Sequence, residues 1–295
     1  MMLNFLRPAL AGLALALAAP VQAQAPQDAD PALWVVEDAD TAIYLFGTVH
    51  VLKPGLSWFD EAVWAAYNQS DEIMLEMIEP DQAAMSALVM RLAVNPTGPS
   101  LTDRLPAGKR AAYASALAEL GMPATALDRF DPWFAAVTLS VAGLPKFGYN
   151  PESGAERIIS TAAKAAGKKM SGLETAEQQL GYFDSLPEAL QLRFLESTVE
   201  DFPKMGSELD KMVASWAAGT PDALATSLNE SMRETPEIAK ILLSDRNARW
   251  AEWIAKRMQT PGNVFIAVGA GHLAGRDSVQ AWLAKRKLVA KRIRY

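Results

Sequence analysis

Two segments, one near each end of the chain, share one local plan in which a short apolar run leads into Gly-x-x-His. Residues 43–46 precede Gly47-Thr48-Val49-His50, and residues 264–268 precede Gly269-Ala270-Gly271-His272. Each run is rich in β-branched and aromatic residues and is shorter than an ordinary helix, so both are predicted to be buried strands. The fold must therefore hold two covered strands, each with a histidine just beyond its end.

Helices and further strands alternate around these two segments. Residues 33–37 and 41–46 flank Asp38-Ala39-Asp40 and predict an opening hairpin, and the remaining strands are predicted at 72–78, 168–173 and 288–294. Helical spacing predicts helices after Ser57 and Asp60, at 154–166 and at 272–285, with helical insertions at about 81–150 and 185–258. This order predicts an α/β fold with a mixed central β-sheet, an opening hairpin, flanking helices and helical insertions, in a single domain over residues 26–295.

The first 25 residues are predicted to be a cleavable export signal. Arg7 gives a short positive region, residues 10–19 form an apolar run, and small residues suit cleavage after Ala23 or Ala25. The apolar run is far shorter than the roughly 20 residues that span a bilayer, and no second such stretch follows it, which disfavours a membrane anchor. We expect a periplasmic or secreted protein with no transmembrane segment.

The amino-acid composition excludes several kinds of binding site and argues against one class of partner. The chain has no cysteine, which excludes disulfides, zinc–thiolate sites and a lipid-modified cysteine, and a chain of this length can bury a large core without them. The net charge of −6 argues against a nucleic acid partner, because phosphate binding needs a basic face. The one basic stretch, residues 285–294, alternates with apolar residues and is predicted to be a solvent-facing edge strand.

Two carboxylates occupy the same kind of position as the two histidines. Glu76 follows the predicted strand residues 73–75, and Glu174 follows the strand that ends at Leu173. In open α/β sheets, ligands bind outside the carboxyl ends of the strands, and a glycine there lets the backbone turn sharply and another group approach. If these strands are parallel neighbours, the four side chains should face one pocket.

Imidazole and carboxylate side chains together suit a divalent metal ion such as Mn, Co or Zn. His50, His272 and Glu76 are the predicted ligands. Such an ion would lower the pKa of a bound water, and a nearby carboxylate could accept its proton during attack on a carbonyl carbon. The pattern therefore predicts metal-assisted hydrolysis of a peptide or a small-molecule substrate.

Each of these residues also has a purely structural interpretation. A histidine at a strand end is often only a hydrogen-bonded loop residue, but two in the same setting, in a chain with no other histidine, favour a functional pair. Glu76 could cap the helix that follows it, and Glu177 could do so in the first turn of a helix beginning at Thr175. Arg246 and Asn247 open a further helix, where Arg246 either pairs with an exposed acid or binds an anionic substrate group or oxyanion.

The order and spacing of these residues carry a resemblance to a known family. The motifs are Gly47-Thr48-Val49-His50, Leu75-Glu76-Met77, Gly172-Leu173-Glu174-Thr175 with Glu177-Gln178, Arg246-Asn247 with Trp250, and Gly269-Ala270-Gly271-His272. With them the chain resembles the TraB/GumN family, which is similar to the Tiki metalloproteases and more distantly to the erythromycin-esterase and ChaN-like fold. The resemblance runs from Leu33 to the C-terminus.

The resemblance implies a divalent metal ion at the two histidines and Glu76, with Glu174 and Arg246 around the pocket, and peptide hydrolysis as the activity. It also leads us to expect an aspartate just after Gly154, where this chain has Glu156. The longer side chain keeps the charge and moves the carboxylate by about one methylene length. The residues expected to support the site are Gly47, Thr48, Glu156, Glu177 and Gly269.

Three functions are compatible with this pattern. The first is an exported metal-dependent hydrolase in which Glu76, Glu174, Arg246 and Asn247 are catalytic. The second is a non-catalytic periplasmic protein that uses the same pocket to bind a peptide, a metal or haem. The third is a scaffold in which the histidines only brace their loops.

Overall fold

The computed structural model describes residues 26–231 and 235–295, so the predicted export signal and both of its cleavage positions lie outside the described residues. Its centre is a six-stranded mixed sheet with the order β6-β5-β7-β3-β2-β8. The strands of this sheet are β2 (Leu33–Glu37), β3 (Thr41–Thr48), β5 (Glu72–Met77), β6 (Lys169–Glu174), β7 (Gly262–Gly269) and β8 (Lys291–Ile293). A separate two-stranded parallel sheet joins β1 (Gln27–Asp28) to β4 (Leu56–Ser57).

The sheet divides into a parallel part and an antiparallel part. Strands β6, β5, β7 and β3 run parallel to their neighbours, whereas β2 is antiparallel to both β3 and β8. The predicted hairpin of β2 and β3 is therefore confirmed. Of the basic stretch 285–294, only Lys291–Ile293 forms the predicted edge strand, as β8, whereas residues 285–287 form a turn after α13. The carboxyl ends of the four parallel strands consequently meet at one edge.

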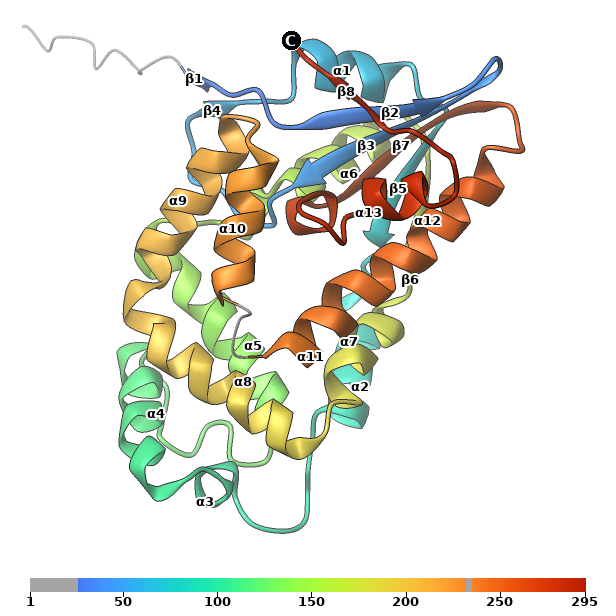
Figure 1. Cartoon of the computed structure of the whole chain (residues 1–295). Coiled ribbons are helices and arrows are strands. Elements are labelled where there is room, and N and C mark those ends of the chain that lie inside the picture. Colours follow the sequence, from blue (N-terminus) through green and yellow to red (C-terminus); the bar gives the residue numbers. More distant parts are fainter. Residues whose placement is uncertain (1–25, 232–234) are drawn as a thin grey trace, which may run out of the picture.

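The two faces of the sheet are covered because its strands alternate their side chains with a period of two. On one face, Phe46, Leu75 and Phe265 pack with residues of α1 (Glu61–Asn68) and α6 (Ala155–Ala165). On the other face, Leu45 and Ile266 pack with α12 (Asp245–Arg257) and α13 (Val279–Ala284). The sheet is thus the middle layer of a helix–sheet–helix arrangement (Figure 1).

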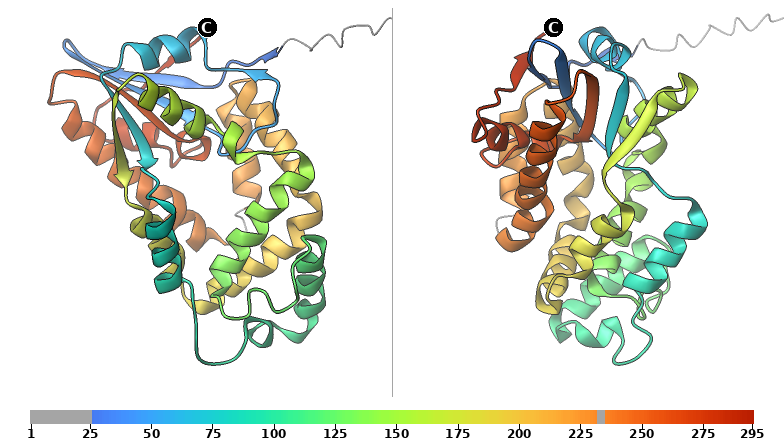
Figure 2. Two further views of the ribbon diagram at one scale, coloured as in Figure 1. Left: turned by 180° about the vertical axis from the view of Figure 1, so that it is seen from behind. Right: turned by 90° about the vertical axis from the view of Figure 1, so that its right-hand side faces the viewer.

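Most of the remaining helices extend away from the sheet beyond the carboxyl ends of its parallel strands (Figures 1 and 2). Helices α3, α4, α5 and α8 share a hydrophobic core of their own, in which Leu117, Leu139 and Leu195 are fully buried. Helices α9 (Met205–Ala217) and α10 (Pro221–Ser231) reach back to the sheet, where Trp216 and Leu224 join the core of α1 and α6. The other helices are α2 (Gln82–Leu92), α3 (Leu101–Arg104), α4 (Ala107–Glu119), α5 (Pro132–Gly143), α7 (Ala176–Asp184), α8 (Glu188–Asp201) and α11 (Pro236–Ala239).

The prediction of one helix over residues 272–285 is wrong. The chain instead forms a short 3-10 turn, η5 (Ala270–Leu273), then leaves the helical path, and begins α13 only at Val279. Gly275 has a φ of +77°, a left-handed conformation that interrupts a right-handed helix. Ser278 then starts the new helix, because its side chain accepts a hydrogen bond from the amide of Ala281.

The helices of the described residues can also be compared with the thickness of a membrane. None of those in residues 26–231 and 235–295 combines the length and the apolar character needed to cross a bilayer.

Candidate functional site

The register of the parallel strands places the predicted site residues side by side. Thr48 pairs with Gly269 across β3 and β7, Leu75 pairs with Ala267 across β5 and β7, and Met77 pairs with Glu174 across β5 and β6. Strands β3 and β6 end in Thr48 and Glu174, Glu76 is the last residue but one of β5, and β7 ends at the glycine of the second histidine motif. The sheet itself therefore brings both histidine motifs and both carboxylates to one edge.

Gly269 marks the point where three of these side chains meet. A Cβ atom built on Gly269 would lie 3.1 Å from Glu76 Oε1 and 3.7 Å from both His50 Nε2 and His272 Cδ2. Contacts shorter than about 3.4 Å are tighter than nearly all real Cβ contacts, so a side chain here would crowd the carboxylate. The missing side chain of Gly269 is what lets the two imidazoles and Glu76 approach one another.

Glu76 is held by groups on three other elements. Its Oε1 accepts a hydrogen bond from the amide of Gly269 at 2.7 Å. Its Oε2 accepts from Arg246 Nη2 at 2.6 Å and from Gln179 Nε2 at 3.1 Å. The carboxylate is therefore fixed at the end of β5 by β7, α12 and α7, and it does not serve to cap α2, whose first amides are capped by Asp81.

The surroundings of Glu76 keep it ionised. Burial alone would raise its pKa, but His272, Arg246 and His50, together with the amide of Gly269, lower the pKa to about 2. Only 12% of its side chain is exposed, so this is a buried negative charge that positive groups hold in place.

Glu174 and Arg246 form the most completely buried ion pair of the site, with 4% and 10% of their side chains exposed. Arg246 Nη2 donates to Glu174 Oε2 at 2.7 Å, and Arg246 Nε lies 3.0 Å and 3.1 Å from the two carboxylate oxygens. Tyr182, Trp250 and Gln179 add further hydrogen bonds of 3.0, 3.1 and 3.2 Å to the same carboxylate. Arg246 therefore pairs with a buried acid and not with an exposed one.

The hydrogen bonds of His272 select one tautomer. Asn247 Nδ2 donates to the carbonyl oxygen of Asp277 at 2.8 Å, so its Oδ1 is the atom that lies 2.6 Å from His272 Nδ1. His272 Nδ1 must then carry the proton, which leaves a lone pair on Nε2 facing Arg246 Nη1 at 3.1 Å. Burial lowers the pKa of His272 to about 3. The ring of Trp250 packs against this neutral imidazole, with 4.3 Å between the two ring centres.

His50 lies in the opposite kind of environment. Its Nδ1 is 2.8 Å from Glu156 Oε1, and 71% of its side chain is exposed. The negative charge of Glu156 raises the pKa of His50 to about 9, so this imidazole is protonated at neutral pH. Thr48 donates a hydrogen bond to the same oxygen of Glu156, and the longer side chain of Glu156 thus reaches both residues of the first motif.

The other predicted residues divide between the site and its surroundings. Glu177 is exposed and pairs with Arg91 at 2.9 Å, so the structure does not bring it to the two histidines. It lies in the first turn of α7, where the capping box is formed by Thr175 and Gln178. Asn247 faces His272 and orients that imidazole, and its side chain is fully engaged there.

Three contributors were not predicted as site residues. Gln179 and Tyr182 on α7, and the indole of Trp250 on α12, all bind Glu174. A signal was present, because Gln179 and Tyr182 are three residues apart and so lie on one face of the helix that begins directly after Glu174. Trp250 follows Arg246 by four residues, which is the same kind of helical neighbour.

The donor atoms fit a divalent metal ion in kind, although one of them is engaged by another group. Each imidazole has its Nδ1 held by a second side chain, which is the arrangement that orients Nε2 as a metal ligand. However, Arg246 Nη1 lies on the lone pair of His272 Nε2, which is 3.7 Å from Glu76 Oε1. Within residues 26–231 and 235–295, no three acidic, histidine or cysteine side chains stand ready to hold an ion together. A metal would therefore require Arg246 Nη1 to move and His50 to lose its Nε2 proton, because a protonated imidazole has no lone pair for an ion.

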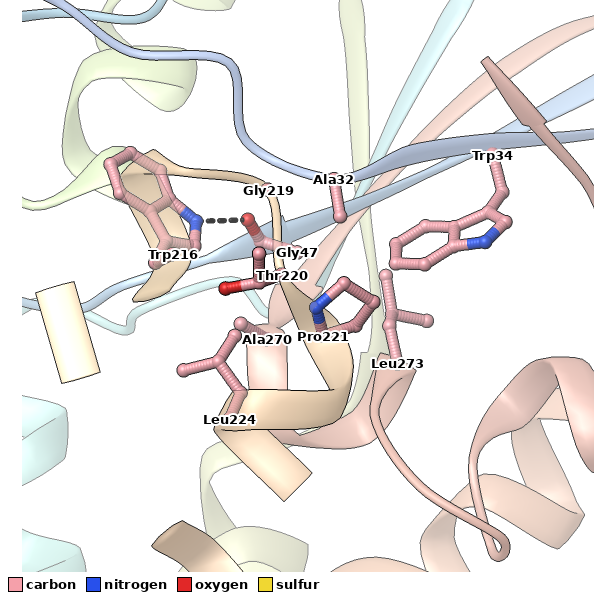
Figure 3. Close-up of a pocket in the computed structure, with 10 residues that line it drawn as sticks. All are labelled: Ala32, Trp34, Gly47, Trp216, Gly219, Thr220, Pro221, Leu224, Ala270 and Leu273. Atoms are coloured by element: carbon pink, nitrogen blue, oxygen red, sulfur yellow. Dashed lines mark hydrogen bonds between the residues drawn. The ribbon is translucent and has the colours of Figure 1, made fainter. Parts of the chain in front are cut away.

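A small apolar cavity lies beside the two motifs (Figure 3). Its volume of about 10 Å³ is just enough to hold one water molecule. Gly47 and Ala270 contribute to its wall, and Trp216 Nε1 donates to the carbonyl oxygen of Gly47 at 2.7 Å. A Cβ atom on Gly47 would lie 3.1 Å from Ala270 Cα, so this glycine permits close packing of the two motifs.

The comparisons with known proteins agree with the motifs. The model of the TraB/PrgY/gumN family matches residues 32–292. The chain is 22% identical over 253 residues to the uncharacterized protein YbaP of Escherichia coli (strain K12), covering 86% of this chain and 92% of that protein. It is also 22% identical over 275 residues to an uncharacterized protein of Treponema pallidum (strain Nichols), covering 87% of this chain and 81% of that protein. No solved structure matches the chain. Because the family model spans almost all of the described residues, including both histidine motifs and both carboxylates, the chain belongs to the TraB/PrgY/gumN family.

Proposed function

We propose that this protein is a metal-dependent hydrolase that cleaves peptide bonds. The observation that carries the proposal is the meeting of two imidazoles and one carboxylate around Gly269, each imidazole with its Nδ1 already fixed. Hydrogen bonding of this kind behind a histidine is what keeps a metal-ligating nitrogen directed at its ion. The ligands in this proposal are His50 Nε2, His272 Nε2 and the carboxylate of Glu76.

A bound Mn, Co or Zn ion would supply Lewis-acid polarisation of a carbonyl group and a water of lowered pKa. The protein side chains hold the surroundings of that chemistry. Glu76, with its pKa lowered to about 2, suits a ligand better than a general base, because a base works best with a pKa near the operating pH. Asn247 and Glu156 orient the two imidazoles.

Arg246 pairs with both buried carboxylates. Its Nη2 bridges Glu76 and Glu174, and its Nη1 is shared between His272 Nε2 and the carbonyl oxygen of Leu242 at 3.1 Å. On our proposal, Nη1 keeps the bond to Leu242 and gives up His272 when the metal enters. The bonds from Nε and Nη2 to Glu174 persist and keep the carboxylates in place.

Metal titration tests the ligand set. We expect the wild-type protein to bind one equivalent of Mn, Co or Zn in isothermal titration calorimetry, and His50→Ala, His272→Ala and Glu76→Gln to lose at least tenfold in affinity. Glu177→Gln is the matched control, because Glu177 is exposed and lies outside the site. Wild-type protein that takes up none of the three metals would rule out the proposal.

Turnover separates hydrolysis from binding. We expect the metal-loaded wild type to cleave members of a peptide library and Glu76→Gln to cleave none of them. If both proteins bind peptide equally and neither cleaves it, the site is one for sequestration and the hydrolase proposal fails. Thermal melting of both proteins checks that the substitution leaves the fold intact.

The proposal also includes export from the cytoplasm, which depends on the signal predicted in residues 1–25. Cell fractionation with N-terminal sequencing tests it. We expect a periplasmic or secreted protein whose first residue is Gln24 or Pro26.

A further inference from the structure

A second arginine, Arg249, lies at the rim of the site and is not used in the arrangement described above. It is on α12, three residues after Arg246, and 51% of its side chain is exposed. Its Nη2 donates to Tyr182 Oη at 2.9 Å, and its guanidinium lies 5.3 Å from the centre of the Tyr182 ring. Tyr182 thus holds Arg249 in position between α7 and α12.

The nearest acid makes a long ion pair with Arg249 but no hydrogen bond. Arg249 Nη2 is 4.0 Å from Glu174 Oε1, beyond hydrogen-bonding distance. That oxygen already lies within 3.1 Å of donors from Tyr182, Trp250 and Arg246. A carboxylate offers about four lone-pair sites in all, and Glu174 Oε2 receives Arg246 and Gln179 as well. No acceptor position is therefore left on Glu174 for Arg249.

Arg249 therefore has only a long ion pair of 4.0 Å with Glu174, whose charge Arg246 already compensates at 2.7 Å. Within residues 26–231 and 235–295, its hydrogen bond to Tyr182 is the one that the side chain makes. A planar guanidinium with free, solvent-facing N–H groups is matched in shape by a carboxylate, which it binds through two parallel hydrogen bonds. Ordering by Tyr182 lowers the conformational entropy lost when such a bond forms.

We propose that Arg249 binds a carboxylate of the substrate at the rim of the site, and this inference rests on the proposed peptide hydrolysis. The carboxylate can come from the C-terminus of a peptide or from an acidic side chain. In either case the anion pairs with a cation that Tyr182 orients and that Glu174 contacts only through a long ion pair. Arg249 is then a specificity-determining residue, separate from the groups that hold the metal.

Three small peptides distinguish the sources of the carboxylate. The probes are N-acetyl-trialanine with a free C-terminus, the same peptide as its C-terminal amide, and N-acetyl-Ala-Glu-Ala amide. Binding is measured by nuclear magnetic resonance titration of metal-loaded protein, with turnover followed separately. We expect the wild type to bind one or both acidic peptides roughly tenfold more tightly than the neutral amide, as one charge-assisted hydrogen bond allows.

The variants assign the preference to one residue. Arg249→Ala should bind all three peptides equally, and Arg249→Lys should keep only part of the preference, because it retains the charge without the planar fork. Lys256→Ala is the matched control, since it removes one positive charge from an exposed position two turns further along α12. It should keep the full preference.

The outcomes separate this inference from the hydrolase proposal. Three results would overturn the role of Arg249. The wild type could bind the acidic and the neutral peptides equally, it could bind none of the peptides, or the preference for the acidic peptides could survive in Arg249→Ala. If the preference for the acidic peptides depends on Arg249 but no peptide is cleaved, the inference holds and the hydrolase proposal is the one that fails.

Discussion

His50 and His272 carry the same side chain into opposite electrostatic surroundings. Glu156 raises the pKa of His50 to about 9, whereas burial lowers the pKa of His272 to about 3. Between these values, one imidazole is protonated and the other is neutral. The two therefore couple the stability of the metal-free protein to pH with opposite signs.

Acid should destabilise the wild type through His272. The unfolded state takes up a proton near pH 6.5, before the folded state does near pH 3, so this contribution is complete above pH 6.5 and is lost as the pH falls. Between pH 6.5 and 5 the loss in free energy of unfolding is about 2 kcal/mol. Urea unfolding at several pH values should show a shallower decline for His272→Gln over this range.

His50 should act in the alkaline range. Its folded pKa lies above the unfolded value, so the stability that it contributes is fully present below pH 6.5 and is lost as the pH rises through about 9. His50→Gln should remove this alkaline decline. Because the chain has only two histidines, their ring proton signals can be titrated directly, and equal pKa values for the two would contradict both predictions.

Asn247 should control the tautomer of His272. Asn247→Ala removes the acceptor at 2.6 Å from Nδ1, and we expect metal affinity to fall roughly 10- to 100-fold, as for other residues that orient a metal-ligating histidine. Asn247→Asp keeps an acceptor at the same place and should retain most of the affinity. Nitrogen chemical shifts of His272 report the tautomer, and an unchanged shift in Asn247→Ala would argue against this role.

At this scale, the sequence identifies which residues gather but not what they do to one another. The position of each histidine and carboxylate after a strand predicted their meeting at one edge. The bonds of Arg246 to Glu76 and Glu174, and the contact of Asn247 with His272, depend on how α12 packs over the sheet. Strand periodicity does not specify that packing.

Among the elements, the contact between the loop after β3 and the start of α6 should be the most sensitive to a single substitution. A Cβ atom on Gly154 would overlap the carbonyl oxygen of His50, although the φ of −61° is ordinary for any residue. Gly154→Ala should therefore displace the first histidine motif and lower the free energy of unfolding by about 1–3 kcal/mol. Thermal melting and the ring signal of His50 measure the two effects.

Gly181 provides the matched control for this substitution. It lies inside α7 with open space around the built Cβ, so Gly181→Ala should leave the site unchanged and raise stability by about 0.5–1 kcal/mol. Similar losses from both substitutions would mean that steric overlap at Gly154 is not the cause.

The strands and most helices of the described chain follow from periodicity, because alternation and helical spacing are read locally. The last helix was predicted too long because residues 272–285 keep an apolar spacing that suits a helix. Gly275 and Ser278 were the local signals of the interruption. The π-helical turn η4 (Lys240–Ser244) before α12 has no comparable signature in the sequence.

In the molecule as a whole, the helices beyond the carboxyl ends of the parallel strands and the site at the sheet edge are stabilised by separate hydrophobic cores. Leu117 is fully buried in the core of α3, α4, α5 and α8, whereas Ile266 lies in the core between β7 and α12. Leu117→Ala and Ile266→Ala should each lower the free energy of unfolding by about 2–5 kcal/mol. Only Ile266→Ala should also weaken metal binding and shift the ring signals of the histidines.

The pairing of Thr48 with Gly269 fixes where the two histidine loops start relative to each other. Both histidine loops begin at the same paired position of two neighbouring parallel strands, and neighbouring strands are spaced about 4.8 Å apart. A one-residue slip of β7 would move the second loop by about 3.3 Å along the strand and turn every side chain of β7 to the wrong face. The affinity of any ligand that binds both imidazoles therefore depends on the register of β3 and β7, and measuring it shows whether the two strands have paired correctly.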